Sequence, residues 1–255
     1  MIATLPRFRD NTIARCGLIA GVIACGLLAD QRIELWGSML TSLAVWVLFL
    51  YWLHRADSAT RLALAACVIY ATIGEIFLSL VWGLYEYRSG GIPLFVPPGH
   101  ALLFMLGGAI AVRAPSWIVW FTALGAAPFV VFLVMSGAST LDALLFALFV
   151  LCIVFGRAKK LYAVMFVLAL AMEIYGTVLG NWRWSADVAW VGLTALNPPL
   201  AAGAFYCVLD LLVVSTVARW HSGGAPLVQA AAPGTFPSIA AGGQALGAQR
   251  SYCRA

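Results

Sequence analysis

The sequence predicts an all-α polytopic transmembrane helical bundle of about eight spans, arranged as two parallel four-span repeats. The first reason is composition, because 63% of the 255 residues are hydrophobic and only 10% are charged. A water-soluble globular domain of this size does not have that balance. The second reason is the spacing of the apolar runs, and the third is a pattern of residues that occurs twice along the chain.

Eight apolar runs are interpreted as membrane spans, for which roughly 17 to 25 residues are needed. They cover about 13–29, 34–53, 61–83, 98–112, 116–135, 140–156, 161–181 and 198–218. Residues 1–221 then form a single transmembrane domain, with one half at about 13–112 and the other at about 116–218. Residues 222–255 contain few large apolar side chains and are expected to be a disordered cytoplasmic tail.

The positions of Lys and Arg test this count independently, because cytoplasmic loops hold an excess of both. With both termini inside, twelve of the 15 basic residues lie on the inner side and only Arg32, Arg88 and Arg183 on the outer side. This predicts a multi-pass protein of the inner (plasma) membrane with both termini cytoplasmic. The net charge of +5 follows from the same bias and indicates no nucleic-acid partner.

Two stretches of the chain share one pattern of residue types. The first, EIFLSLVWGLYEYRSGGIPLFVPPGHALLF, starts at Glu75, and the second, EIYGTVLGNWRWSADVAWVGLTALNPPLAAGAFYCVLD, starts at Glu173. Each begins Glu-Ile-aromatic, has a hydroxyl four residues on, passes through a Tyr- or Trp-rich turn and restarts at a Pro-Pro pair. We interpret this as an internal duplication, whose copies should face each other around a pseudo-two-fold axis along the membrane normal.

Polar side chains recur at spacings of three and four along the third span and just beyond it, which places them on one helical face. They are Thr72, Glu75, Ser79, Trp82 and Glu86. A polar stripe on a membrane helix faces protein or water rather than lipid. It fits either a hydrogen-bonded packing seam or a functional site, and the carboxyl of Glu75 favours the site.

Three carboxyls are the catalytic candidates. Glu75 and Glu173 each lie about nine residues, or roughly 13 Å, inside the outer aromatic residues, and Asp210 lies about 12 residues, or roughly 18 Å, from the second Pro-Pro pair. Ionisable groups at this depth are costly and usually functional, and a carboxyl that keeps its proton serves as a general acid. Asp210 has no counterpart in the first half, so it should make the two glutamates inequivalent.

Candidate substrate-binding residues surround these carboxyls. The hydroxyls one turn after each glutamate are expected to orient it, and the aromatic turns are expected to border the entrance, although the second turn also fits a headgroup-level anchor. The outer loop at 84–97 is expected to fold back over the bundle as a cap. The candidates are Ser79, Tyr85, Tyr87, His100, Thr177, Asn181, Trp182 and Tyr206.

No cofactor and no metal are expected. The chain contains no nucleophile elbow, H-E-x-x-H, P-loop or dinucleotide fingerprint. A metal site built from the three carboxyls and His100 would have one deep histidine, which is a poor ligand set for zinc or iron. The six cysteines are scattered and form no C-x-x-C pair.

One family resemblance involves the first of the two stretches. The run of Glu75, then Gly83-x-Tyr85-x-Tyr87, then GGIPLFVPP resembles the pattern of the bacterial and archaeal carotenoid hydratase family, multi-span proteins that add water to the end of a polyene chain. The resemblance implies that Glu75 is an acid and that Tyr85 and Tyr87 lie near the substrate entrance. It is local, and the turn lacks the Thr-Gly that the family has before its aromatic pair.

These observations favour an integral membrane enzyme that acts on a hydrophobic or isoprenoid-like lipid by carboxylate acid-base chemistry, and the resemblance implies a lyase of the hydratase type. The lipid bilayer and a hydrophobic small molecule are the expected partners. A proton-coupled carrier using the same carboxyls and a membrane scaffold without chemistry are the alternatives. A pocket that opens sideways between helices would favour the enzyme. A cavity continuous with water on one face would favour the carrier.

Overall fold

The computed structural model describes residues 12–33 and 36–223, which form eight α-helices, a π-helical segment and four short strands. The helices are α1 (Thr12–Arg32), α2 (Gly37–Arg55), α3 (Ser58–Glu75), η1 (Ile76–Val81, π-helical), α4 (Val96–Arg113), α5 (Ile118–Met135), α6 (Leu141–Phe155), α7 (Lys159–Leu179) and α8 (Gly203–Gly223). Within this part of the chain, seven helical stretches are long and apolar enough to cross a membrane, and α6 is apolar but has 15 residues. The predicted all-helical, membrane-compatible fold is confirmed. Of the predicted tail at 222–255, residues 222 and 223 belong to α8, and the remainder lies outside the described residues.

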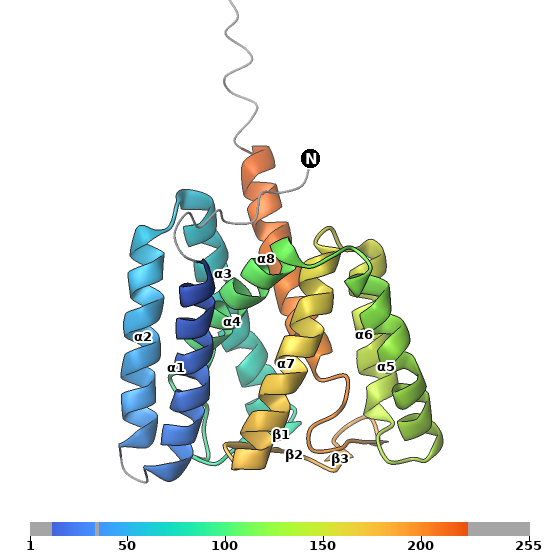
Figure 1. Cartoon of the computed structure of the whole chain (residues 1–255). Helices are drawn as coiled ribbons and strands as arrows, with labels where there is room; N and C mark the ends of the chain where they lie inside the picture. The colour runs from blue at the N-terminus through green and yellow to red at the C-terminus, as the bar shows by residue number, and fades with distance from the viewer. Residues whose placement is uncertain (1–11, 34–35, 224–255) are drawn as a thin grey trace, which may run out of the picture.

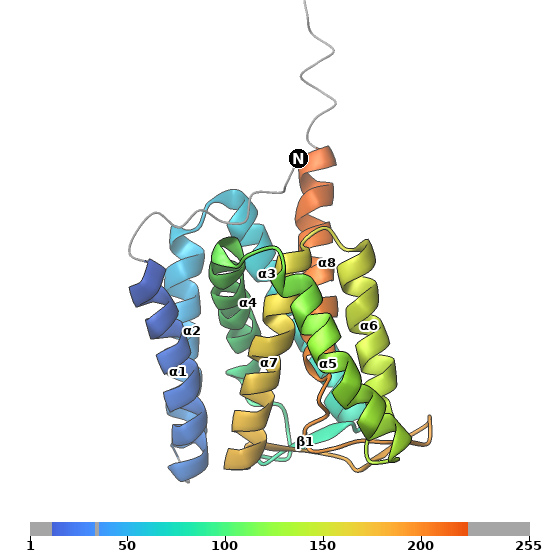
Figure 2. The same cartoon turned by 45° about the vertical axis from the view of Figure 1, so that its right-hand side comes forward.

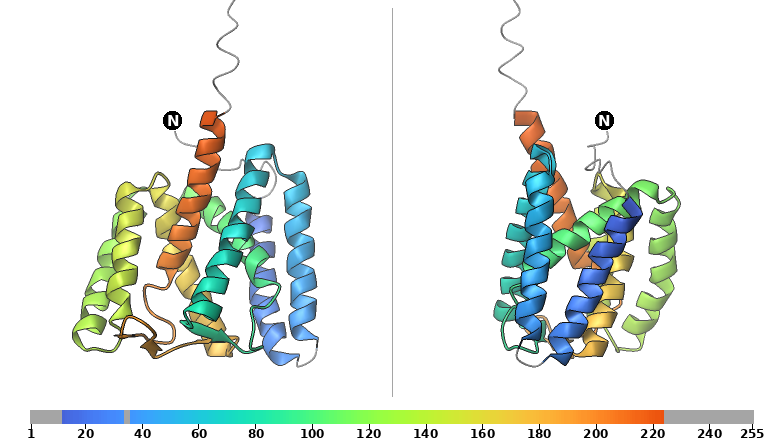
Figure 3. Two further views of the ribbon diagram at one scale, coloured as in Figure 1. Left: turned by 180° about the vertical axis from the view of Figure 1, so that it is seen from behind. Right: turned by 60° about the vertical axis from the view of Figure 1, so that its left-hand side comes forward.

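Four helices form the centre of the bundle. α3 packs against α8, and α4 packs against α7. In Figure 1, α4 and α7 lie toward the viewer, and the rear view in Figure 3 brings α3 and α8 forward. The pair α1 and α2 flanks this centre on one side and the pair α5 and α6 on the other, as Figures 1 and 2 show. Two opposite grooves of the central four helices are therefore formed by α3 with α8 and by α4 with α7.

Local sequence signals account for several helix ends. The Asp57 carboxylate accepts a hydrogen bond of 2.7 Å from the backbone N–H of Thr60 and caps α3. α4 carries proline in its first turn, where the missing N–H has no helical partner to lose, as the first Pro-Pro pair predicts. α7 ends at Gly180, whose φ of 88° lies in the left-handed region that favours glycine.

A short antiparallel strand pair lies across one end of the bundle, at the bottom of Figure 1. It consists of β1 (Tyr85–Tyr87) and β2 (Trp182–Trp184), with Glu86 opposite Arg183 at its centre. Side chains alternate along a strand, so the four outer aromatic residues of this pair are buried while Glu86 and Arg183 are exposed. The two segments interpreted as turns in the sequence thus satisfy their backbone groups by pairing with each other.

The chain enters the bundle before α8 begins, after the small strand pair β3 (Asp187–Val188) and β4 (Leu193–Thr194). α8 starts part-way along the bundle, and a non-helical connection leads up to it (Figure 3, left). Non-helical backbone at membrane depth is tolerated where protein buries and satisfies it. Here the Asp142 carboxylate accepts from the Ala201 N–H at 2.6 Å, and the Ser139 hydroxyl accepts from the Leu196 N–H at 3.3 Å.

Close packing of α8 on α7 depends on Gly203, because a Cβ there would clash with the backbone of Phe166. We expect Gly203→Ala to destabilise the protein by about 1–3 kcal/mol, since backbone atoms cannot move aside as a flexible side chain can. Gly108→Ala in α4 is the matched control, because its Cβ meets nothing within 4 Å and alanine is the better helix former. Unfolding in detergent, followed by circular dichroism, measures both. Equal stability of the two variants would contradict the packing argument.

Candidate functional site

Glu75 and Glu173 come from the two helices that precede the strand pair, and their side chains are buried, each with 6% of its surface exposed. Glu75 is the last residue of α3, where the chain continues into η1. Single π-helical turns are often found at functional sites. Glu173 lies in the last two turns of α7. Both carboxyls line the same two cavities at the centre of the four-helix core.

The strand β1 supplies two hydrogen-bond donors to Glu75. The hydroxyls of Tyr85 and Tyr87 donate to Glu75 Oε2 at 2.9 and 2.7 Å. Both reach the same oxygen because residues two apart on a strand point to the same side. Burial, followed by the neighbouring Glu75 carboxyl, raises the pKa of Tyr85 and Tyr87 well above the ordinary value of tyrosine. Both phenols therefore keep their protons and act as donors.

The strand β2 supplies hydrogen-bond donors to Glu173, and here the donors are indole N–H groups. The indole N–H groups of Trp182 and Trp184 donate to Glu173 Oε2 at 2.8 and 3.0 Å, and the Tyr206 hydroxyl donates to Oε1 at 3.0 Å. An indole N–H is a donor only, so both indoles point their hydrogens at Oε2. Hydrogen bonds from three donors favour the ionised form of this carboxyl, and Oε1 accepts only one of the three.

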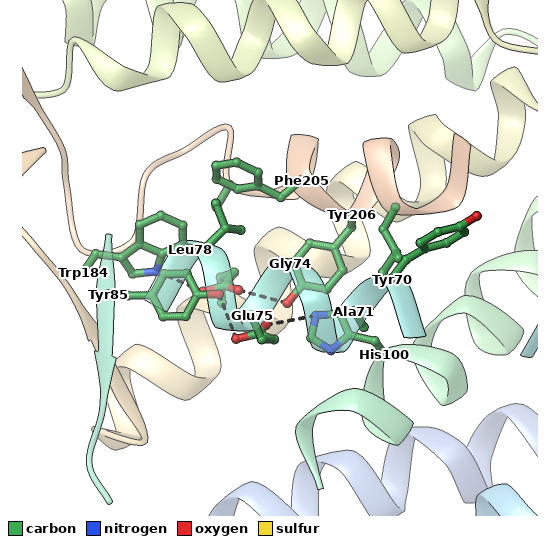
Figure 4. Close-up of a pocket in the computed structure, with 13 residues that line it drawn as sticks. Tyr70, Ala71, Gly74, Glu75, Leu78, Tyr85, His100, Trp184, Phe205 and Tyr206 are labelled. Carbon is green, nitrogen blue, oxygen red and sulfur yellow. Dashed lines mark hydrogen bonds and ion pairs between the residues drawn. The ribbon is translucent and has the colours of Figure 1, made fainter. Parts of the chain in front are cut away.

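His100 connects α4 to Glu75. Its Nδ1 lies 2.9 Å from the Val96 carbonyl oxygen, and its Nε2 lies 3.4 Å from Glu75 Oε1. A carbonyl only accepts, so Nδ1 carries a hydrogen, and a neutral ring then presents an acceptor at Nε2. Glu75 Oε1 therefore has the imidazole Nε2 as its neighbour, whereas Oε2 has the two phenols. Tyr206 stacks on the imidazole at a centroid distance of 5.0 Å and an interplanar angle of 8°, as Figure 4 shows beside Glu75.

Two cavities meet at this cluster. Five residues line both of them: Glu75, Tyr85, His100, Glu173 and Tyr206. The α3–α8 cavity is completed by Tyr70, Ala71, Gly74, Leu78, Trp184, Ala202, Phe205 and Leu209. The α4–α7 cavity is completed by Val22, Ile23, Leu27, Thr41, Val45, Tyr87, Phe95, Val96, Gly99, Leu103, Met172 and Trp182. Each has a volume of about 60 Å³, several times the roughly 10–15 Å³ that one water molecule needs.

Asp210, the third predicted catalytic carboxyl, lines neither cavity. It follows Tyr206 by one turn of α8, which places it roughly 5 Å further from the strand pair. Asp210 is fully buried, and neither of its oxygens has a hydrogen-bond partner in the described part of the chain. An isolated buried carboxyl of this kind is far less costly as the neutral acid.

Three of the predicted substrate-binding residues also lie outside the cavity linings. The Thr177 hydroxyl donates to the backbone carbonyl of Glu173, at 2.8 Å, and not to its carboxyl. Asn181 is buried and donates to Asp30 Oδ2 at 2.8 Å, which ties the end of α7 to α1. Ser79 is buried in η1. The other five predicted residues, Tyr85, Tyr87, His100, Trp182 and Tyr206, line one or both cavities.

Trp184 and Phe205 are aromatic residues of the site that were not among the predicted ones. Trp184 donates to Glu173, and Phe205 lines the α3–α8 cavity and stacks on Trp184 at a centroid distance of 6.3 Å. The alternation Tyr-x-Tyr and Trp-x-Trp was the available signal for Trp184, because two aromatic residues at a spacing of two indicate one face of a strand. No comparable pattern marks Phe205 in the sequence.

Comparison of the chain with protein-family models, with curated proteins and with solved structures finds no match.

The indole donors should be coupled energetically to the Glu173 carboxylate. We expect Trp184→Phe to destabilise the protein by about 1.5–3 kcal/mol, because a charge-assisted buried hydrogen bond is lost. In a Glu173→Gln background the loss should be smaller by about 0.5 kcal/mol or more. Unfolding of the four proteins of this cycle in detergent gives the coupling, with the exposed Trp120→Phe as control. Identical losses in both backgrounds would contradict the assignment.

Proposed function

We propose that this protein is an integral membrane enzyme that acts on a hydrophobic, isoprenoid-like substrate by acid-base chemistry, adding water across a carbon–carbon double bond. The observation that carries the proposal is that two buried carboxyls line the same apolar cavities and have different hydrogen-bond partners. Glu75 accepts from two phenols and faces the His100 imidazole, while Glu173 accepts from two indoles and one phenol. The local resemblance to carotenoid hydratases supports the same type of reaction.

Glu75 is the general acid. Its Oε2 accepts from two phenols, which leaves Oε1 to carry the proton opposite His100 Nε2. In a low-dielectric cavity the neutral acid beside a neutral imidazole is less costly than a separated charge. Glu75 donates this proton to one carbon of the double bond, whose π electrons form the new C–H bond. The adjacent carbon becomes a carbocation.

Glu173 is the general base. Its carboxylate and the faces of the surrounding aromatic rings stabilise the cation. A water molecule adds its oxygen to the cationic carbon, and Glu173 Oε1 takes the surplus proton from the added water. Transfer of that proton back to Glu75 through water in the cavity restores both groups. One water molecule is added across the bond, and no oxidant or reductant is required.

The enzyme is favoured over the proton-coupled carrier by where the cavities lie. One is located in the groove between α3 and α8, and the other lies between α4 and α7 and the flanking pair α1 and α2. Half-buried residues such as Gly74, Leu78 and Met172 border them. The β1–β2 strand pair, with its buried aromatic residues, lies between the carboxyls and the end of the bundle that is at the bottom of Figure 1. A sideways entrance suits a lipid-dissolved substrate, whereas a carrier requires a route to water.

The finer architecture belongs to the same proposal. We infer eight spans in two four-span halves. A two-fold axis relating the halves would exchange the α3–α8 contact with the α4–α7 contact and strand β1 with strand β2, and the packing of these helices and the pairing of these strands support it. The basic residues support cytoplasmic termini in an inner (plasma) membrane.

Expression in a host that makes isoprenoid lipids should convert a lipid to a product heavier by one water. We expect Glu75→Gln and Glu173→Gln each to lower product formation at least 100-fold, because general acid-base groups typically contribute about 10²–10⁴. Glu86→Gln is the matched control, since Glu86 is exposed on the far face of β1. Mass spectrometry of lipid extracts, normalised to folded protein, measures the product. Full activity of either glutamine variant would overturn the roles assigned here.

A further inference from the structure

A tryptophan lies at the tip of the β3–β4 hairpin, outside both the core and the carboxyl cluster. Trp190 is 70% exposed, whereas Trp182 and Trp184, just before it in the chain, are buried. Its φ is 71°, and within the described residues it is the only residue besides glycines with a positive φ. The left-handed region is unfavourable for a bulky side chain. Contacts around the tip therefore have to hold Trp190 in this conformation.

Two ring contacts and one hydrogen bond hold the tip against the end of η1. The indole of Trp190 stacks on that of Trp82 at a centroid distance of 6.0 Å and an interplanar angle of 5°. Its centroid lies 6.5 Å from the ring of Phe77, which belongs to η1. The Trp82 indole N–H donates to the Ala189 carbonyl at 2.7 Å. The side chain of Trp190 is thus fixed against the helix although most of its surface is exposed.

The base of the same hairpin is bound to the connection between α5 and α6. The Thr194 N–H donates to the Thr140 hydroxyl at 2.8 Å, and the Thr194 hydroxyl donates to the Gly137 carbonyl at 2.9 Å. The hairpin consequently bridges η1 and the α5–α6 connection, at the end of the bundle where Figure 1 labels β3. A side chain on an element fixed at both ends is presented in a defined position, unlike one on a free loop.

The exposed face of Trp190 continues the apolar surface of a helix that is long enough to cross a membrane. Ser58–Val81 is one of the stretches with that length and composition. Its last turns expose Phe77, Leu80 and Val81 to 45, 58 and 54%. In a membrane, apolar side chains exposed on such a helix face lipid. Because Trp190 packs on Phe77, its indole lies where this lipid-facing surface ends.

The indole N–H of Trp190 is available to a ligand. It has no hydrogen-bond partner among the described residues, whereas the indole N–H of Trp82 is engaged by Ala189. An indole combines a large apolar body with one polar donor, which is why tryptophan is enriched where acyl chains meet headgroups. The ester carbonyl and phosphate oxygens of phospholipids are hydrogen-bond acceptors at that level.

We propose that Trp190 is a lipid-interface anchor. Its ring inserts between the acyl chains and the headgroups of the leaflet at the β1–β2 end of the bundle, and its N–H donates to a phospholipid ester or phosphate oxygen. Burial of the indole in this layer offsets the unfavourable backbone conformation that presents it. The partner is the bilayer and not a second protein chain, because the anchor continues a lipid-facing surface. The anchor requires none of the chemistry proposed for the carboxyls.

The anchor also sets the level of the α3–α8 cavity relative to the headgroups. The hairpin leads directly into residues 195–202, which precede α8, and Ala202 lines this cavity. Trp82, which stacks on Trp190, follows the stretch that carries Glu75 and Leu78 on the opposite wall. Both walls are thus connected to the lipid interface through the stacked indoles.

The test is fluorine NMR on the full chain, labelled with fluorotryptophan and reconstituted in phospholipid nanodiscs. The resonance that is missing in Trp190→Phe belongs to Trp190, and the one missing in Trp184→Phe provides a buried control. A phospholipid with a nitroxide close to its headgroup and a water-soluble gadolinium chelate are compared as broadening agents. We expect the nitroxide lipid to broaden the Trp190 resonance at least threefold more than that of Trp184, and at least threefold more than the chelate broadens it.

Broadening of Trp190 mainly by the chelate would place the tip in water and overturn the anchor. Protection from both agents would overturn it as well, because protein would then cover the tip. Trp190→Gly tests the indole itself, since glycine adopts the same φ without strain. This variant should remain folded by circular dichroism, and the nitroxide lipid should broaden Trp82, assigned through Trp82→Phe, at least twofold more once the stacked ring is gone. Unchanged broadening of Trp82 would contradict the packing on which the anchor depends.

Discussion

A buried carboxylate inside an apolar bundle must be hydrogen-bonded, and that requirement explains much of the architecture around this site. Glu75 and Glu173 lie where water cannot solvate them freely, so donors have to come from the protein. The β1–β2 strand pair provides four of these donors from one face. Pairing the strands also satisfies the backbone at the end of the bundle, so one small element stabilises the fold and orients the site.

The difference between the two halves of the site is chemical. Tyrosine in β1 and tryptophan in β2 occupy matching positions, and His100 faces Glu75 where Tyr206 faces Glu173. Indoles donate only, and both of them donate to Glu173, which favours the ionised form of this carboxyl. Phenols and an imidazole leave a place for a proton at the other. In the proposed mechanism this difference provides an acid and a base from similar geometry in both halves, as acid-base catalysis of hydration requires.

The sequence was sufficient to predict the helical membrane fold and several members of the site, because composition and apolar length are direct consequences of the bilayer as solvent. The shared pattern around Glu75 and Glu173 also pointed to the two carboxyls that line the same cavities. Asp210 could not be placed in the same way. Its depth was counted from the second Pro-Pro pair, yet α8 begins only at Gly203. The strand pairing depends on contacts between distant segments, which local patterns do not specify.

The central claim is that the proton is carried by Glu75 and not by Glu173. Infrared spectroscopy of the protein in nanodiscs at neutral pH tests it directly, because a protonated carboxyl has a carbonyl stretching band that a carboxylate lacks. The account predicts that Glu75→Gln removes one such band and that Glu173→Gln removes none. Loss of the band in Glu173→Gln together with its persistence in Glu75→Gln would contradict the assignment of acid and base.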